Sequence, residues 1–370
     1  MKPEKKLSPL EQKLNNFVVK YLTGIPFVQK MFFVEHLHTM IHAGLSVVES
    51  LDVLSKEIEN QKLRTVIAAI KSDVEKGQTL SESLTKHPKA FPPIYVQMIA
   101  AGEVAGKLEE SLFQVTNQMR KTHELMSSIR GAMIYPSVII AAMGGIGVMM
   151  VTVVLPKLIT LFNEFDAELP LATKIMITIT KFASSPFNMV LIVVITIGTI
   201  MGFMSALRKF PDFKYFVHKM NLHLPIFGKI MKKINLARFS LTLSSLLKST
   251  IPIIDAVQIT ADTCGNVIYR NILKQAAEKI KTGAPLSEIL SQNPALFPPM
   301  VTEMIMVGER TGEVQQLLDE LSAFYGSEVD KTMKNFTAII EPVIIIILGV
   351  AVAFMAIAVI MPMYSLVQNF

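Results

Sequence analysis

The sequence predicts an all-α integral membrane protein with two homologous cytosolic helical bundles, of about six helices each, and three transmembrane helices. Three observations support this prediction. The chain of 370 residues is 51% hydrophobic and only 18% charged, whereas an average soluble domain is about 25% charged. Three long stretches hold no charged residue. One long segment also occurs twice in the same order.

Residues 1–30 are expected to form a cytosolic N-terminal segment. The stretch is basic but contains Glu4 and Glu11, and prolines at positions 3 and 9 interrupt it. A secretory signal peptide needs an apolar stretch after its basic start, and this segment has none. We therefore expect internal segments to direct insertion into the membrane.

The first bundle is predicted over residues 31–131. Apolar residues recur at helical spacing from Phe33 to Val53 and again from Leu63 to Val74. Gly77 suits the end of a helix, and Pro93 suits the first position of the next one. The alternating pattern of a β-strand does not appear, so the bundle is expected to be helical throughout.

Each charge-free stretch is longer than a bilayer requires. About 20 apolar residues cross the hydrocarbon core, and a charge near the centre of such a helix costs about 2.5–3.5 kcal/mol. A buried helix of a soluble protein normally keeps a polar face, which these stretches lack. The charge-free stretches are 131–156, 182–207 and 342–370, and the predicted spans are 132–156, 182–207 and 338–363.

The charges beside the spans predict their direction. Linker 208–236 carries many lysines and arginines against one acid, Asp212, whereas acids offset the lysines of loop 157–181. The positive-inside rule then places the N-terminus, the linker and the second bundle, 237–337, in the cytosol. Loop 157–181 and tail 364–370 are extracytoplasmic. The net charge of +6 is accordingly attributed to contact with anionic membrane lipid, and no nucleic-acid partner is expected.

The internal repeat is the most specific feature of the sequence. A shift of 206 residues places Phe33 on Phe239, and the match continues without a gap to Pro156 on Pro362. Between 77–106 and 283–312, 14 of 30 positions are identical. Because one extra span lies between the copies, both copies lead into the membrane in the same direction. They are parallel repeats, not the inverted repeats of many transporters.

The shared proline and glycine positions are expected to form corners between helices, with Gly102-Glu103 and Gly106 interrupting the chain before a long helix from about Lys107. Among the polar residues of the repeat, Glu103 and Glu309 are the strongest candidates for a specific role. We favour a capping or solvated carboxylate; contact with a partner or a divalent cation is the alternative. The repeated motif comprises Phe91, Pro92, Pro93, Gly102, Glu103 and Gly106, matched by Phe297, Pro298, Pro299, Gly308, Glu309 and Gly312.

Motifs of catalysis and cofactor binding are missing from the sequence. It has no phosphate-binding G-x-x-x-x-G-K-[ST], no H-E-x-x-H and no G-x-S-x-G, so neither an enzyme nor a cofactor is predicted. His38 and His42 have a spacing suited to a metal, but no acid nearby in the sequence completes a set. Metal binding there is therefore the disfavoured interpretation. The single cysteine, Cys264, is expected to be an inert buried thiol.

These residues resemble the GspF/PilC family, the polytopic core proteins of type II secretion and type IV pilus systems. The likeness covers about residues 30–370 and rests on the doubled Phe-Pro-Pro and Gly-Glu-x-x-Gly motifs, on Glu341-Pro342 at the last span, and on FNEFDAELPLATK at 162–174. The resemblance implies a location in the bacterial inner membrane. It also implies three kinds of partner: a hexameric assembly ATPase, pilins or pseudopilins, and other inner-membrane assembly proteins.

The sequence is compatible with two functions. The favoured one is an inner-membrane platform that couples the assembly ATPase to insertion of pilins or pseudopilins into a filament. Lys229, Lys232 and Lys233 are then possible contacts for the ATPase. The alternative is a small-solute transporter or channel subunit, for which polar residues inside the spans would be expected. A G-x-x-x-G pattern at Gly198 and Gly202 permits close helix packing, and a homo-oligomer is expected.

Overall fold

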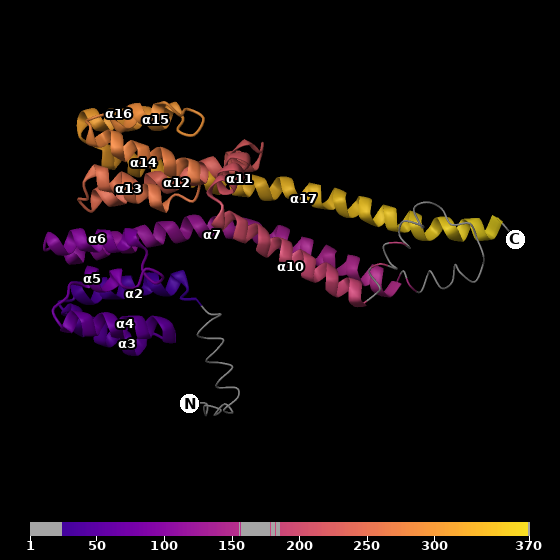
Figure 1. Cartoon of the computed structure of the whole chain (residues 1–370), viewed down its shortest axis with the longest axis horizontal. Coiled ribbons are helices and arrows are strands. Elements are labelled where there is room, and N and C mark those ends of the chain that lie inside the picture. Colours follow the sequence, from indigo (N-terminus) through magenta and orange to yellow (C-terminus); the bar gives the residue numbers. More distant parts are fainter. Residues whose placement is uncertain (1–23, 155, 157–177, 179–181, 183–185, 369–370) are drawn as a thin grey trace, which may run out of the picture. The chain divides into compact units, whose positions relative to one another are not determined.

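The computed structural model describes residues 24–154, 156, 178, 182 and 186–368 (Figure 1). Within these residues every regular element is a helix, as predicted. Most of the predicted loop 157–181, including the family motif at 162–174, lies outside the described residues, as do residues 1–23 of the N-terminal segment. The first bundle contains α2 (Phe27–His42), α3 (Val47–Glu57), α4 (Gln61–Glu75), α5 (Leu80–Thr85), α6 (Pro93–Val104) and the start of α7 (Leu108–Met149).

The second bundle repeats this order of helices. Five of its helices begin 206 residues after their counterparts, which is the register of the sequence repeat. The sixth, α12, is longer than α2 at its start but ends at the matching residue. The helices are α12 (Phe227–Lys248), α13 (Ile253–Thr263), α14 (Val267–Lys281), α15 (Leu286–Ser291), α16 (Pro299–Thr311) and the start of α17 (Val314–Gln368).

Local sequence explains where these helices begin and end. Thr79 accepts a hydrogen bond from the amide of Glu82 at 3.2 Å, and Glu82 accepts one from the amide of Thr79 at 3.1 Å, so this pair forms a capping box. Pro93 opens α6, where the missing amide hydrogen has no helical partner to lose. Gly77 has a φ of +90°, a left-handed conformation in which glycine carries no steric cost.

The prediction for Gly102 and Glu103 was wrong in one respect. Both residues lie inside α6, and the helix continues to Val104. The break before α7 falls at Gly106, which has a φ of +69°. Because Gly106 is a glycine, it takes this left-handed conformation without strain and forms the corner, while Gly102 and Glu103 remain helical.

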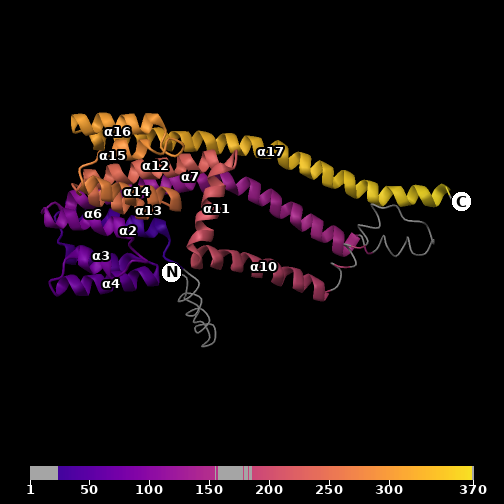
Figure 2. The same cartoon turned by 45° about the horizontal axis from the view of Figure 1, so that its top comes forward.

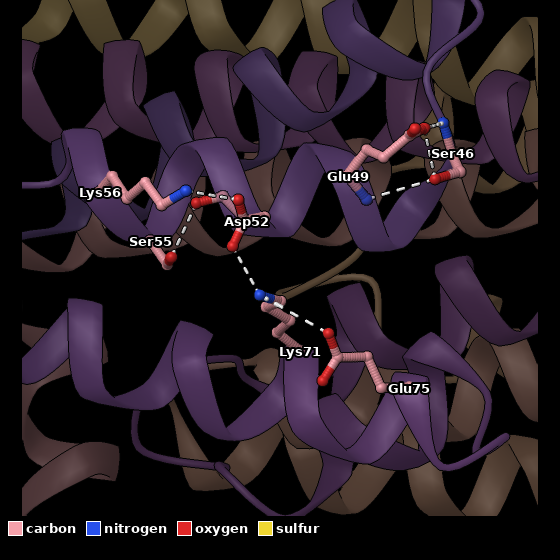
Figure 3. A network of polar contacts seen from close by, with 7 residues as sticks. All are labelled: Ser46, Glu49, Asp52, Ser55, Lys56, Lys71 and Glu75. Carbon is pink, nitrogen blue, oxygen red and sulfur yellow. Dashed lines mark hydrogen bonds and ion pairs between the residues drawn. The ribbon is translucent and has the colours of Figure 1, made fainter.

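The first bundle is held by an apolar core and a charged network on its outer side. Leu51 and Leu54 of α3 and Leu63 of α4 are each at most 1% exposed, and burial of such a side chain contributes about 1.5–3 kcal/mol. Helices α3 and α4 lie side by side in both views (Figure 2). Asp52 accepts hydrogen bonds from Lys56 at 2.6 Å and from Lys71 at 2.5 Å (Figure 3). These bonds lower the pKa of Asp52 to about 2, and the bond from Lys56 has the largest effect.

The chain divides into two compact units. One unit holds residues 1–126 and 231–327, and therefore most of both bundles; the other holds 127–230 and 328–370. In the second unit, α7 and α17 supply two helices long and apolar enough to cross a membrane, with mean hydropathies of 2.3 and 2.5. In the most apolar stretch of α7, 0% is buried, and in that of α17, 12% is buried. A core helix of a soluble protein would be buried, so these exposed apolar faces are suited to lipid.

The second predicted span, 182–207, overlaps α10 (Pro186–Lys209), a helix of 24 residues. Apolar side chains such as Phe187 and Met201 are 74% and 66% exposed along it. The basic residues Arg208 and Lys209 end α10, and α11 (Pro211–His223) follows directly. The helix is thus long enough to cross the hydrocarbon core of a bilayer, and its role as a membrane span stays a prediction.

Contacts between α7 and α17 show that these two helices run parallel within the second unit. Ser128 donates a hydrogen bond to Asp330, Thr337 donates one to the carbonyl of Ala132 at 3.5 Å, and Tyr135 donates one to Glu341 at 3.5 Å. The partner number rises with the residue number at each step, which only parallel helices allow. This arrangement agrees with the parallel repeats expected from the sequence.

Candidate functional site

The repeated Gly-Glu-x-x-Gly motif joins three helices at one corner of each bundle. At Gly102, a Cβ atom would lie 2.2 Å from the Cβ of Ser111 in α7. At Gly308, it would lie 2.7 Å from the Cα of Val314 in α17. Real side chains do not tolerate such distances, so the absence of a side chain lets α6 and α16 pack directly against the helix that follows each of them.

Glu103 spans the same corner in the other direction, from α6 to the start of α5. Its Oε1 accepts a hydrogen bond from the amide of Leu80 at 2.6 Å, and its Oε2 accepts one from the amide of Ser81 at 2.9 Å. The first amides of a helix have no partner within the helix, and the helix dipole favours a negative charge there. Glu103 therefore caps α5 from a residue 23 positions later in the chain.

Glu309 makes the equivalent contacts in the second bundle. It accepts hydrogen bonds from the amide of Leu286 at 2.6 Å and from the amide of Ser287 at 3.3 Å, and the Ser287 hydroxyl also donates to it. The residue before α15 is Pro285, which makes no side-chain cap. Glu309 thus carries a larger share of the capping in its bundle than Glu103 does. Both glutamates thus make the contacts of a carboxylate that caps a helix, which is the interpretation favoured from the sequence.

The Phe-Pro-Pro triplets anchor the same corners in the cores. Phe91 packs against Phe33 with ring centroids 5.4 Å apart, and Phe297 packs against Phe239 at 5.5 Å. All four rings are at most 2% exposed. Because Phe239 and Phe297 are the repeat partners of Phe33 and Phe91, one aromatic contact has been kept in both copies. In the second copy, Tyr269 adds a third ring at 5.3 Å from Phe297.

The two bundles contact each other within the first unit. The Ser245 hydroxyl donates to the side-chain oxygen of Gln118 at 2.6 Å, and Lys121 pairs with Asp319 at 2.9 Å. Both contacts join α7 to helices of the second copy. The stretch of α7 around Gln118 and Lys121 therefore takes part in both bundles.

A cavity of about 510 Å³ opens beside these contacts. Its lining comes from both copies and includes Tyr95 of α6, Arg238 of α12 and Asp262 of α13. Burial raises the pKa of Tyr95 to about 12, so its hydroxyl stays protonated and is a hydrogen-bond donor at neutral pH. The lining thus combines apolar side chains such as Ile94 and Ile259 with charged ones, Arg238 and Asp262.

The three lysines suggested as partner contacts all lie near the start of α12. Lys229 is exposed, while Lys232 and Lys233 are half-buried. Their spacing of three and four residues places them on one face of the helix. We call these three residues the basic stripe, and Lys229 is the most exposed of them.

The histidine pair has an acid partner that sequence reasoning missed. Glu109, in the first turn of α7, lies with its Oε1 2.6 Å from Nδ1 of His42. His38, His42 and Glu109 offer three ligand atoms that all lie within 4.8 Å of one another. Sequence reasoning missed this acid because it searched for one near the pair in the chain. Glu109 is 67 residues away and comes close only through the packing of α2 on α7.

Cys264 is buried, as expected. Burial raises the pKa of its thiol to about 12. Because the thiolate is the reactive form of cysteine, this thiol is inert towards nucleophilic chemistry at neutral pH.

Comparisons with known proteins agree with the repeat and with the corner motifs. The profile of the family described as "Type II secretion system (T2SS), protein F" matches twice, at residues 33–156 and 239–362. The chain is 34% identical to the type IV pilus assembly protein PilC of Thermus thermophilus over 338 residues, 90% of this chain and 82% of that protein. It is 35% identical to PilC of Myxococcus xanthus over 343 residues, 93% of this chain and 81% of that protein. It is 29% identical to the type II secretion system protein F of Pseudomonas aeruginosa over 373 residues, 99% of this chain and 91% of that protein.

Proposed function

The chain belongs to the family of type II secretion system protein F, and from this membership we propose that it is the inner-membrane platform of a type IV pilus or type II secretion machine. In this role both bundles face the cytosol, the N-terminus is cytosolic and the C-terminus is extracytoplasmic. The platform couples a hexameric assembly ATPase to the insertion of pilins or pseudopilins into the filament, and it has no enzymatic activity of its own.

The observation that carries the proposal is the duplicated bundle, each copy of which leads into an apolar helix through one continuous helix. Helix α7 begins at Leu108 in the first bundle and continues to Met149, and α17 begins at Val314 in the second and continues to Gln368. A motor bound to the bundles would act on helices that themselves enter the membrane. A transporter would instead need a substrate path, and the predicted spans hold no Asp, Glu, Lys or Arg except Glu341, which lies near the cytosolic end of the last span.

Reporter fusions test the orientation. A fusion after Arg238 is expected to report the cytosol, and a fusion at Asp166 is expected to report the outside. The reverse pattern would overturn the topology, and with it the access of a cytosolic ATPase to both bundles.

Charge reversal tests the coupling to the ATPase. The variant Lys229→Glu with Lys232→Glu is expected to recover less of the assembly ATPase in a pull-down from membranes, because an acidic surface of the partner would then be repelled. The matched control reverses two exposed lysines of the first bundle, Lys76→Glu with Lys89→Glu. Equal recovery with both variants would exclude the basic stripe as the contact and favour lipid headgroups in its place.

The genes beside the coding sequence provide an independent test. A P-loop ATPase and prepilin-like proteins are expected there. A solute-binding protein or permease subunits in their place would favour the transporter alternative.

A further inference from the structure

We propose that His38, His42 and Glu109 form a binding site for a divalent transition-metal ion of the zinc class, and that the ion joins the end of α2 to the start of α7. All three residues belong to the first unit. The inference rests on their geometry and ligand chemistry, and it does not depend on the proposed function.

The three side chains converge on one point between the helices. His38 and His42 lie one helical turn apart, with their rings stacked at a centroid distance of 5.9 Å and an interplanar angle of 21°. Glu109 approaches His42 from the other helix at 2.6 Å, and all three ligand atoms lie within 4.8 Å of one another. Donors around one tetrahedral zinc ion at about 2.1 Å are about 3.4 Å apart. Small rotamer changes therefore suffice to bring them around an ion.

Packing fixes the two helices that carry these ligands. The ring of His38 also contacts that of Phe113 in α7 at 5.4 Å, which limits its rotation. Further along, Glu35 pairs with Arg120 at 2.7 Å, and Phe27 stacks on His123 at 6.1 Å. As the residue number falls along α2 it rises along α7, so the helices are antiparallel. The ligands thus lie at one end of an ordered interface, not on a free loop.

The ligand types select the class of ion. Two imidazole nitrogens and one carboxylate oxygen suit zinc, copper and nickel, whereas calcium and magnesium take oxygen ligands almost exclusively. The side chains of His42 and Glu109 are 69% and 51% exposed, so an ion reaches them from solvent. Three protein ligands leave a fourth position of a tetrahedral ion for water or for a donor from a partner.

The second copy supplies a natural contrast. Its residues at the matching positions are Ser244, Lys248 and Gln315. The lysine is a cation, and the neutral amide of glutamine is a weaker ligand than a carboxylate. The ligand set therefore belongs to the first copy. Serine, lysine and glutamine already occupy these helix positions in the second bundle. Substituting them for His38, His42 and Glu109 is therefore expected to be compatible with the fold.

Zinc titration of the full chain in lipid nanodiscs tests the proposal. Calorimetry is expected to show one zinc ion bound per chain, and cobalt is expected to give the visible absorption of a four-coordinate site at the same stoichiometry. The variant His38→Ser, His42→Lys, Glu109→Gln, which carries the second copy's residues, is expected to bind zinc at least tenfold more weakly. His36→Ala is the matched control, because His36 is exposed on another face of α2 and its loss should leave the affinity unchanged.

The single variant Glu109→Gln separates a built site from adsorption to surface histidines. It is expected to weaken zinc binding about tenfold and to reduce the rise in melting temperature that the same zinc concentration gives the unaltered protein. Unchanged affinity in Glu109→Gln, or an equal loss in His36→Ala, would overturn the proposal. Both single variants leave the apolar core intact, so these results stand even where the triple variant fails to fold.

Discussion

Removal of the carboxylate at each corner should affect the two copies unequally, although the motif is the same. In the first copy, replacing Glu103 with alanine leaves the capping box of Thr79 and Glu82 in place. In the second copy, Pro285 offers no side-chain cap, so replacing Glu309 with alanine leaves the first amides of α15 without their protein acceptor.

The expected magnitudes follow from these contacts. Loss of a side-chain cap costs about 0.5–2 kcal/mol, and hydrogen bonds to a charged group contribute about 1.5–3 kcal/mol. Because both corners are partly open to water, we expect about 2 kcal/mol for Glu309→Ala and about 1 kcal/mol for Glu103→Ala. If α15 and α5 open locally, these values correspond to about 30-fold and about fivefold faster amide exchange in the two helices.

Hydrogen exchange followed by mass spectrometry measures this difference in peptides that cover α5 and α15. The readout is local, so it does not require reversible unfolding of a membrane protein. Glu320→Ala, at an exposed position of α17, serves as the control and should change neither helix. Equal acceleration in the two copies would refute the reasoning from Pro285. Unchanged exchange in both would refute the capping role itself.

Three further predictions concern packing, charge and helix direction. Gly102→Ala should destabilise the chain by about 1–3 kcal/mol through overpacking against Ser111. The control Gly131→Ala should not destabilise it, because Gly131 has open space around it. Thermal unfolding followed by circular dichroism measures the difference between the two variants. Hydrogen bonds to Lys56 and Lys71 hold the pKa of Asp52 near 2, below its usual 3.8, so the stability that they contribute is present above pH ~4 and is lost as the pH falls towards ~2. Asp52→Asn should remove that part of the acid dependence, and an unchanged acid-unfolding profile would contradict this origin. Ser128→Cys with Asp330→Cys should form a disulfide on mild oxidation, because these residues are hydrogen-bonded between the parallel helices α7 and α17; a shifted pair such as Ser128→Cys with Glu341→Cys should not.

Local signals in the sequence were sufficient to predict the helices and their corners. Pro93 opens a helix because its ring fixes φ and removes only an amide that the helix does not use. Gly77 ends one because its φ is positive. Such constraints act within a few residues, so they can be read without knowing the fold. The repeat provided information that single residues do not, because it predicted that the helices of both copies begin at matching positions.

The partners across the fold could not be predicted in the same way. Glu103 caps a helix that begins 23 residues earlier, and Glu109 meets a histidine 67 residues away. Helical periodicity shows which face of a helix is buried, but it does not show which helix covers that face. The role of Gly102 was misjudged for the same reason, because the close contact that requires a glycine is made by Ser111 of another helix.

The conserved spacing between the helices makes the two bundles interchangeable parts. From α3 to the start of α7, every helix has a counterpart that begins 206 residues later. The turns between α3 and α6 have the same lengths in both copies, whereas α16 ends one residue later in the repeat than α6 does. Residues 47–104 could therefore be transplanted onto 253–310 without a linker, with the caps at Asn60 and Thr79 and the glycine corner at Gly77 in register. Chimeras with two first bundles or two second bundles would then separate the effects of the shared scaffold from those of the surface residues that differ between the copies.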